Sequence, residues 1–351
     1  MNITFNKYKK LFTEKAINSG YSEDNILKCL SYAEPIMKKG FPVIYNTSHL
    51  SSLVGYNKIF IKRAVNHTTY FYRKFEISKK NGTKRVLLEP LPSLKEIQSW
   101  ILEEILYNHK VSRYAKGYIP NRSIKDHVRY HTKKEKVLTL DIKKFFDNVS
   151  FKLVENIFVK IGYSELISNL LTKLCFLDGK LPQGAPTSPY ISNIILLEFD
   201  EKISKYCSDN NLKFTRYADD LAFSGKIKKT ELVNLVRAEL KKLGLKLNND
   251  KIKLMKQNQP QIISGIIVNE KTQIPKRIRN QIRNEMFYIK KFGIESHMQK
   301  TNQTKSKSVY LKHLLGKINY LLTINFKDNE FIEYKRILHN EIKLVGNNAQ
   351  K

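Results

Sequence analysis

Residues 214–225, with the sequence FTRYADDLAFSG, place two adjacent acids between two short apolar runs. Strand-forming residues on both sides of a short polar interruption predict a β-hairpin with Asp219 and Asp220 at its turn. Two neighbouring carboxylates repel each other, and burying either one without a partner is costly. The fold must therefore bring a cation to the end of this hairpin. The simpler alternative is an exposed turn in which water solvates both acids, because Asp is common in turns.

A third acid ends another strand-like segment. Residues 136–146, KVLTLDIKKFF, form an apolar run that stops at Asp141. If this strand and the hairpin share one sheet, Asp141 faces Asp219 at a strand end. Such an oxygen-rich site suits Mg²⁺, a hard cation that shares protein carboxylates with substrate phosphates. Two such ions, about 3.5–4 Å apart, can activate an attacking hydroxyl and stabilise a leaving pyrophosphate.

The overall charge predicts a polyanionic partner. The 351 residues include 63 Lys and Arg but 32 Asp and Glu, a formal charge of +31. Each neutralised phosphate releases condensed counterions, which favours nucleic-acid binding. Apolar stretches fall short of the about 20 residues that span a bilayer, and the first 20 residues lack the apolar segment of a secretory signal. We therefore expect no membrane partner and a cytoplasmic protein.

The cysteines and the common motifs exclude several classes of enzyme. Cys29, Cys175 and Cys207 are far apart in sequence and form no CxxC pair. This pattern argues against a zinc site or a disulfide framework and suits a reducing cytosol. Walker A, GxGxxG, HExxH and GxSxG motifs do not occur in the sequence.

Apolar periodicity and turn signals predict a mixed organisation. Residues 1–50 have the pattern of short amphipathic helices, and 51–65 continue as a helix with Ser51 or Ser52 as its cap. Asn81-Gly82 joins two β-rich runs and predicts a hairpin with a basic tip. A helix is predicted over 93–109, and strands alternate with helices over roughly 113–270. One of these helices is predicted over 189–207.

The carboxy-terminal part, beyond Pro275, is helical and very basic. The polar residues 296–308 are predicted to form a loop between two of its helices. We expect Phe287, Tyr288 and Tyr320 to lie in the core rather than to act as stacking platforms.

Several motifs together resemble those of reverse transcriptases. Residues 217–220, YADD, resemble the YxDD box of that family, and LDIKKFFDNVS resembles its first catalytic motif. LPQGAPTSPYISNI at 181–194 resembles the segment that contacts template and nucleotide. LGLKLNNDKIKL resembles the motif that supplies an active-site lysine, and ISGIIV the primer-grip hairpin. The motifs follow the family's order across roughly 70–270.

The resemblance implies an α+β right-hand polymerase fold. We expect a helical leader over 1–68, fingers and a palm with an antiparallel sheet over 69–272, and a helical basic thumb over 273–351. It also implies an RNA-directed DNA polymerase that uses two Mg²⁺ ions, for which Mn²⁺ can substitute.

The same resemblance assigns the catalytic roles. Asp141 and Asp219 are expected to bind the metal ions beside Ile142, with Asp220 supporting them. Lys251 is the candidate for protonating the leaving pyrophosphate, and Lys253 is a near rival.

Substrate contacts follow from the same motifs. Phe146 is expected to select dNTPs by leaving no room for a 2′-hydroxyl, although an ordinary core aromatic is the alternative. Gln183 and Gly184 are expected to let the backbone approach the template and the incoming base, because Gly has no side chain. Lys84 and Arg85 are expected to clamp the triphosphate; a solvated charged turn is the alternative.

The basic thumb helix supplies the expected nucleic-acid contacts. These contacts would fix register on phosphates rather than distinguish sequences; a solvated helix face is the alternative for each residue. The residues are Lys276, Arg277, Arg279 and Arg283.

Within the family, QGAPTSP, RYADDLAFS and the helical leader resemble bacterial retron reverse transcriptases and related antiviral-defence enzymes. The resemblance implies a structured noncoding RNA as template and primer, a single-stranded DNA product similar to msDNA, a role in phage defence and an effector protein as partner. Two retron marks differ here. Where retron proteins commonly have Asn-Ala-x-x-His, residues 127–131 of this chain are HVRYH. Where they have Val-Thr-Gly, residues 263–265 are ISG. His127 and His131 lie four apart, but a third ligand is not evident, so zinc is not predicted.

Three alternatives remain open at this stage. The first is a noncatalytic RNA-binding protein on a polymerase scaffold, against which the intact set of acids argues. The second is a template-independent or protein-primed DNA polymerase of a related defence system. RNA synthesis is the third, and Phe146 argues against it.

Overall fold

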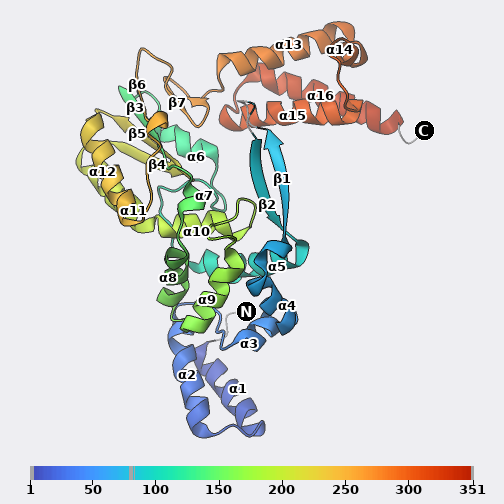
Figure 1. Ribbon diagram of the computed structural model, residues 1–351. Helices are drawn as coiled ribbons and strands as arrows, with labels where there is room; N and C mark the ends of the chain where they lie inside the picture. The colour runs from blue at the N-terminus through green and yellow to red at the C-terminus, as the bar shows by residue number, and fades with distance from the viewer. Residues whose placement is uncertain (1–3, 79–81, 83, 349–351) are drawn as a thin grey trace.

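The computed structural model describes residues 4–78, 82 and 84–348. The chain begins with four helices, and Figure 1 places the first two at one end of the molecule and the carboxy-terminal helices at the other. The four are α1 (Phe5–Asn18), α2 (Glu23–Lys38), α3 (Thr47–Val54) and α4 (Lys58–Asn66). The predicted cap at Ser51 or Ser52 is wrong. Asn46 caps α3 and Asn57 caps α4, each accepting a backbone N–H through its side chain.

A two-stranded antiparallel hairpin follows the leader helices. Its strands are β1 (Tyr72–Ser78) and β2 (Lys84–Pro90), with Ser78 opposite Lys84. This confirms the predicted hairpin, although Asn81 and most of the tip lie outside the described residues. The helix predicted over 93–109 is present as α5 (Pro92–Trp100), followed by a π turn at Ile101–Ile105 and a 3₁₀ turn at Leu106–Asn108.

A four-stranded antiparallel sheet forms the centre of the molecule, in the order β4-β5-β3-β6. The predicted strand ending at Asp141 and the predicted hairpin around Asp219 are both confirmed and are neighbours in this sheet. The strands are β3 (Lys136–Asp141), β4 (Lys213–Tyr217), β5 (Asp220–Gly225) and β6 (Lys253–Lys256).

Helices cover one face of this sheet. Leu138, Leu140 and Phe223 point into a large core that these helices share with the amino-terminal helices. The predicted helix over 189–207 is two helices that meet at Leu196. The helices of this region are α7 (Phe145–Asn148), α8 (Phe151–Ile161), α9 (Glu165–Cys175), α10 (Thr187–Ile195), α11 (Leu197–Asp209) and α12 (Lys229–Lys242). The short helix α6 (Ile124–Val128) instead contributes Val128 to a second core.

The opposite face of the sheet shares a second core with the carboxy-terminal helices. Val137 and Ala222 from the sheet join Met286 and Leu314 in this core. A short hairpin, β7 (Ile262–Ile263) and β8 (Ile266–Ile267), connects the sheet to these helices. The helices are α13 (Lys276–Phe292), α14 (Ile294–Lys300), α15 (Lys307–Ile324) and α16 (Asn329–Asn348).

Two expectations for this region are wrong. The segment predicted as a loop over 296–308 begins inside α14, so its first part is helical. Phe287, Tyr288 and Tyr320 are not core residues, because their exposed fractions are 55%, 41% and 48%. The buried stripe of α13 runs through Ile282, Met286 and Ile289 and leaves both of its aromatic neighbours outside.

Within the described residues, none of the helices combines the length and the apolar character that a membrane crossing requires.

Candidate active site

The three acids converge at one end of the central sheet. Asp141 is the register partner of Asp220, and the backbone N–H of Ile142 donates to the carbonyl of Asp219 at 3.1 Å. Ala218 has a φ of +56°, which turns the chain sharply between β4 and β5. The fold therefore brings together acids that are almost 80 residues apart in sequence.

The electrostatics of this cluster favour a bound cation. Burial raises the pKa of Asp219 to about 6, and the neighbouring carboxylates of Asp220 and Asp141 add to the rise. Burial also raises the pKa of Asp220, although the hydroxyl of Ser264 donates to its Oδ2 at 2.8 Å. Lys251 Nζ lies 2.8 Å from Asp141 Oδ2, and this contact raises the pKa of the lysine. Lys251 thus supplies part of the positive charge that the acids require.

The donor set fits a metal ion that is shared with a substrate. Within the described residues, groups of three or more His, Cys, Asp or Glu side chains that could enclose a metal by themselves do not occur. Mg²⁺ is usually held by one or two carboxylates together with substrate phosphates and water, so a closed protein cage is not required. Partly buried carboxylates that repel each other and hold one lysine are consistent with such a shared site.

A cleft of about 400 Å³ opens beside the acids. Asp141 and Asp220 form part of its wall, and the β7–β8 hairpin closes another side with Ser264 and Gly265. Both candidate lysines line it, but Lys251 is the one that contacts a carboxylate of the cluster.

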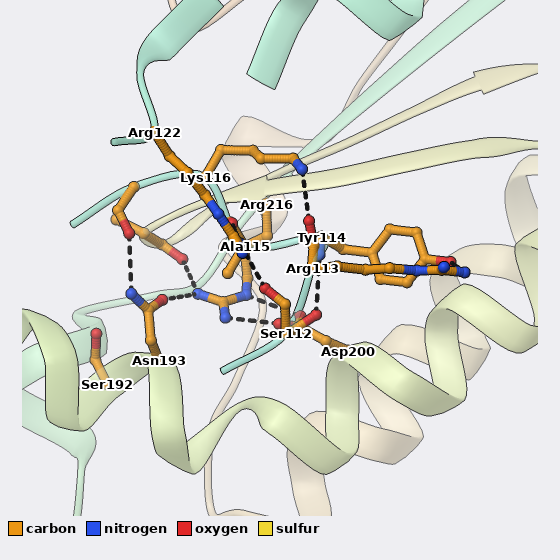
Figure 2. A network of polar contacts seen from close by, with 12 residues as sticks. Ser112, Arg113, Tyr114, Ala115, Lys116, Arg122, Ser192, Asn193, Asp200 and Arg216 are labelled. Atoms are coloured by element: carbon orange, nitrogen blue, oxygen red, sulfur yellow. Dashed lines mark hydrogen bonds and ion pairs between the residues drawn. The ribbon is translucent and has the colours of Figure 1, made fainter. Parts of the chain in front are cut away.

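A buried arginine holds the turn from behind (Figure 2). The Arg216 side chain is fully buried and donates through Nε and Nη2 to the two carboxylate oxygens of Asp200, at 2.8 and 2.7 Å. Its Nη1 donates to Asn193 Oδ1 at 2.9 Å and to the carbonyl of Ala218 at 3.1 Å. Arg216 therefore ties the turn between β4 and β5 to α10 and α11.

The other side of the turn is closed by a glycine. Asn193 Nδ2 donates to the carbonyl of Gly117 at 2.9 Å, and a Cβ on Gly117 would lie 2.9 Å from the backbone nitrogen of Ala218. Arg122 fixes this segment by donating to the carbonyls of Ser112 and Ala115. Sequence patterns alone do not predict this network. A charged Arg216 inside an apolar strand was the available signal, but its partners could not be inferred from spacing.

The two histidines of residues 127–131 belong to a buried hydrogen-bond network on the same sheet. His131 lies 2.7 Å from the hydroxyls of Ser224 and Thr215, through Nδ1 and Nε2 respectively. The Thr215 hydroxyl also lies 2.8 Å from His127 Nδ1. Burial lowers the pKa of His131 to about 3, so both partners hold a neutral ring. His127 has a lowered pKa for the same reason and lines the cleft.

The loop that carries Gln183 and Gly184 docks on the β1–β2 hairpin. The backbone N–H of Leu88 in β2 donates to the carbonyl of Gln183 at 3.1 Å. Gly184 has a φ of +139°, and a Cβ there would lie 2.6 Å from the carbonyl oxygen of Leu88. The structure thus requires glycine at this position for contact with β2. Phe146 lies close by, half-buried in α7 against Phe145, and its carbonyl accepts from the N–H of Leu181.

The remaining predicted residues lie on the β1–β2 hairpin and on α13. Lys84 is exposed and forms an ion pair with Glu76 at 2.8 Å, whereas the side chain of Arg85 lies outside the described part. On α13, Lys276 and Arg277 are exposed.

Two arginines of α13 bond to acids at the start of α16. Arg279 is buried, bonds Asp328 at 2.6 Å and lies over the ring of Phe331. Arg283 makes two hydrogen bonds, of 2.7 and 2.6 Å, to the carboxylate of Glu330. Both guanidinium groups therefore connect α13 to the start of α16.

Comparison with known proteins finds the following similarities. Residues 77–313 match the family described as "Reverse transcriptase (RNA-dependent DNA polymerase)". The retron Ec86 reverse transcriptase of Escherichia coli is 27% identical over 299 residues, covering 83% of this chain and 88% of that protein. The retron Ec83 reverse transcriptase of the same species is 27% identical over 283 residues, covering 75% and 86%. A solved structure of the foamy viral protease-reverse transcriptase with double-stranded DNA has a TM-score of 0.45 at 15% identity, covering 78% of this chain and 39% of that one.

Proposed function

Because the chain belongs to the reverse transcriptase (RNA-dependent DNA polymerase) family and is of the retron type, we propose that it copies a dedicated structured noncoding RNA into single-stranded DNA by two-metal catalysis. RNA-directed DNA polymerase activity and a right-hand architecture follow from family membership. The observation that carries the mechanistic proposal is the convergence of Asp141, Asp219 and Asp220 beside Lys251. We divide the chain into a leader (1–68), fingers and palm (69–272) and a thumb (273–351).

The acids have distinct proposed roles. Asp141 and Asp219 hold Mg²⁺, or Mn²⁺ in its place, beside the backbone of Ile142, and Asp220 supports them from its bond with Ser264. When bound with a nucleotide, the metal ions supply the charge that activates a primer hydroxyl and stabilises the departing pyrophosphate. A metal ion held by Asp141 would compete with Lys251 for the carboxylate oxygen that the lysine contacts. While it contacts Asp141, Lys251 has a raised pKa that keeps its amine protonated. Released from that carboxylate, the ammonium group could donate its proton to the pyrophosphate.

Nucleotide selection is assigned to residues near the loop of Gln183 and Gly184. Phe146 excludes the 2′-hydroxyl of an NTP, and the loop backbone contacts the base pair. Lys84 and Arg85 from the fingers contact the triphosphate. If Phe146 has this role, Phe146→Ala gains NTP incorporation while retaining dNTP incorporation. An unchanged dNTP preference in a folded variant would assign the ring to packing alone.

The biological setting is proposed from the resemblance to retron proteins. The partners are a structured noncoding RNA that is both template and primer, its msDNA-like product, dNTPs and an effector protein in phage defence, within the bacterial cytoplasm. Exposed Lys276 and Arg277 are the proposed phosphate contacts of the thumb. Arg279 and Arg283 support them by fixing α13 to α16.

Purification of the protein from its host, followed by sequencing of bound RNA and DNA, tests this proposal. We expect one RNA species and a DNA complementary to part of it. DNA that matches no bound RNA would instead favour the template-independent or protein-primed alternative. Recovery of the protein free of nucleic acid would contradict the retron assignment.

A further inference from the structure

An exposed row of aromatic rings lies at the end of α13. Phe287, Tyr288 and Phe292 are 55%, 41% and 53% exposed, although large aromatic side chains are usually buried. Tyr288 stacks on Phe292 with a ring-centroid distance of 6.1 Å and on His297 of α14 at 6.1 Å. Phe287 meets Tyr288 edge-on at 5.5 Å. The rings therefore hold one another in a fixed arrangement at the surface.

Lysines lie over these rings. Lys291 Nζ is 5.7 Å from the ring centroid of Phe287 and 5.3 Å from that of Phe292. Lys300 of α14 lies 6.0 Å from the centroid of Tyr288. Positive charge interleaved with exposed aromatic faces is the pattern of surfaces that stack bases and follow a phosphate backbone.

A polar cavity of about 270 Å³ adjoins the row. His297 connects the two features, because its ring stacks on Tyr288 while its Nε2 lies 3.1 Å from the hydroxyl of Tyr310 in the cavity wall. Glu285 is the acid of the wall, and Lys317 bonds its carboxylate at 3.0 Å. Residues that line the cavity include Gln281, Lys305 and His313.

We propose that this thumb surface, defined by Phe287, Tyr288, Phe292, Lys291 and Lys300 with the adjoining cavity, binds an unpaired segment of nucleic acid. Bases stack on the rings, and the lysines and the cavity receive a backbone phosphate. The proposal goes beyond the phosphate contacts assigned to Lys276 and Arg277 and rests on the proposed function, because it takes the nucleic acid held by the polymerase as the ligand.

Two features of the surface define its ligand. Duplex ends offer few free base faces, whereas an unpaired strand presents one at each nucleotide, so the rings favour single strands. Because a stacking ring contacts the base and not the sugar, we expect the site to accept both RNA and DNA. Lys291 and Lys300 lie over the ring faces, so positive charge accompanies the exposed apolar area, which disfavours a broad hydrophobic interface with a protein.

Binding of matched duplexes by the full chain tests the proposal. One duplex is blunt, one carries an eight-nucleotide single-stranded overhang, and one carries an abasic overhang with the same phosphates. We expect the normal overhang to tighten binding at least tenfold and the abasic overhang to give a much smaller gain. The triple variant F287A/Y288A/F292A should lose the gain from the normal overhang while binding the blunt duplex as before. Tyr288→Trp should retain it.

Tyr21→Ala is the matched control, because Tyr21 is also an exposed aromatic, 63% accessible. It lies in the turn between α1 and α2, and Figure 1 shows these helices at the opposite end of the molecule from α13 and α14. The proposal would be overturned if the triple variant gained as much affinity from the normal overhang as the wild type does. It would also be overturned if the abasic overhang gave the wild type the same gain as the normal overhang. Binding of lipid vesicles by the wild type but not by the triple variant, together with an overhang gain that persists in the triple variant, would also overturn it. That result would assign the rings to a membrane surface. A chain that shows the overhang effect but no nucleotide incorporation would contradict the proposed function and leave this inference standing.

Discussion

Asp219 makes the protein less stable at neutral pH unless a cation is bound. Its pKa is about 6 in the folded protein and 3.8 in the ordinary reference state, so folding favours its protonated form. Below pH 4 the carboxyl is protonated in both the folded and the unfolded protein, so it does not change the free energy of unfolding. As the pH rises from 4 to 6 the folded protein loses stability, and the loss persists above pH 6.

We therefore predict that Asp219→Asn stabilises the metal-free protein at pH 7.5 by roughly 3 kcal/mol. The gain should disappear below pH 4, and Mg²⁺ should reduce it by stabilising the wild type. Denaturant unfolding with a chelator present measures the effect. Asp209→Asn, which removes an exposed acid at the end of α11, should have little effect. A destabilised Asp219→Asn at neutral pH would show that the acid cluster is not strained.

The buried pair of Arg216 and Asp200 is expected to position the turn between β4 and β5, which carries the proposed metal ligand Asp219, as well as to stabilise it. Asp200→Asn leaves the Arg216 guanidinium buried without its counter-charge, which should cost about 3–5 kcal/mol of stability. Because Arg216 also holds the carbonyl of Ala218, we predict that the variant needs several-fold more Mg²⁺ for half-maximal activity. Manganese binding, measured directly by spin resonance, should weaken in parallel.

Asp328→Asn provides the control for this prediction. This substitution breaks the ion pair between Asp328 and Arg279 inside the thumb. The two side chains of that pair are each 10% exposed. The substitution should lower stability without changing metal affinity. If both variants shift the metal dependence equally, the Arg216 network is merely structural.

At the scale of the elements, the contact between the Gly184 loop and β2 couples the fingers to the palm. Gly184→Ala places a Cβ against the carbonyl of Leu88 in a left-handed backbone conformation. We predict a loss of about 2–4 kcal/mol and faster amide exchange in β1 and β2. Gly179→Ala is matched, because Gly179 also has a positive φ, +76°, but open space around it. It should cost only about 1–2 kcal/mol, the cost of the left-handed conformation itself. Equal effects of the two substitutions would mean that the loop does not hold the hairpin.

Elements with strong local signals could be predicted from the sequence. The apolar run ending at Asp141 and the hairpin around Asp219 are where periodicity placed them, because both signals lie within a few neighbouring residues. The partners of Arg216 could not be predicted, since Asn193 and Asp200 reach it only through tertiary packing. The exposure of Phe287 and Tyr288 was also missed. Hydrophobicity alone suggested burial, whereas the helical stripe through Met286 decides which face is covered.

At the scale of the whole molecule, the thumb and the palm sheet share one core, so their relative position is set by packing. Val137 and Ala222 of the sheet lie in the same cluster as Leu311 and Ile318 of α15. The formal charge of +31 acts on any nucleic acid placed between these parts. Non-specific affinity should therefore fall steeply with salt.

We predict that Lys276→Gln lowers the slope of log affinity against log salt concentration by about 1, because one phosphate contact is lost. The loss of affinity should be similar for all duplex sequences. Binding titrations at several salt concentrations measure it. Lys38→Gln, at the end of α2 and paired with Glu34, should leave the slope unchanged. An unchanged slope for Lys276→Gln would remove this residue from the proposed interface.

The central claim is that Asp141 and Asp219 converge to bind the metal ions of nucleotide transfer. Incorporation of dNTPs on a primed RNA template, followed across a Mg²⁺ titration, tests it most directly in the wild type and in Asp141→Asn and Asp219→Asn. The account predicts Mg²⁺-dependent extension by the wild type and a loss of at least about a thousandfold in each folded variant, since metal charge supplies several kcal/mol to the transition state. Extension at the wild-type rate by both variants would contradict it.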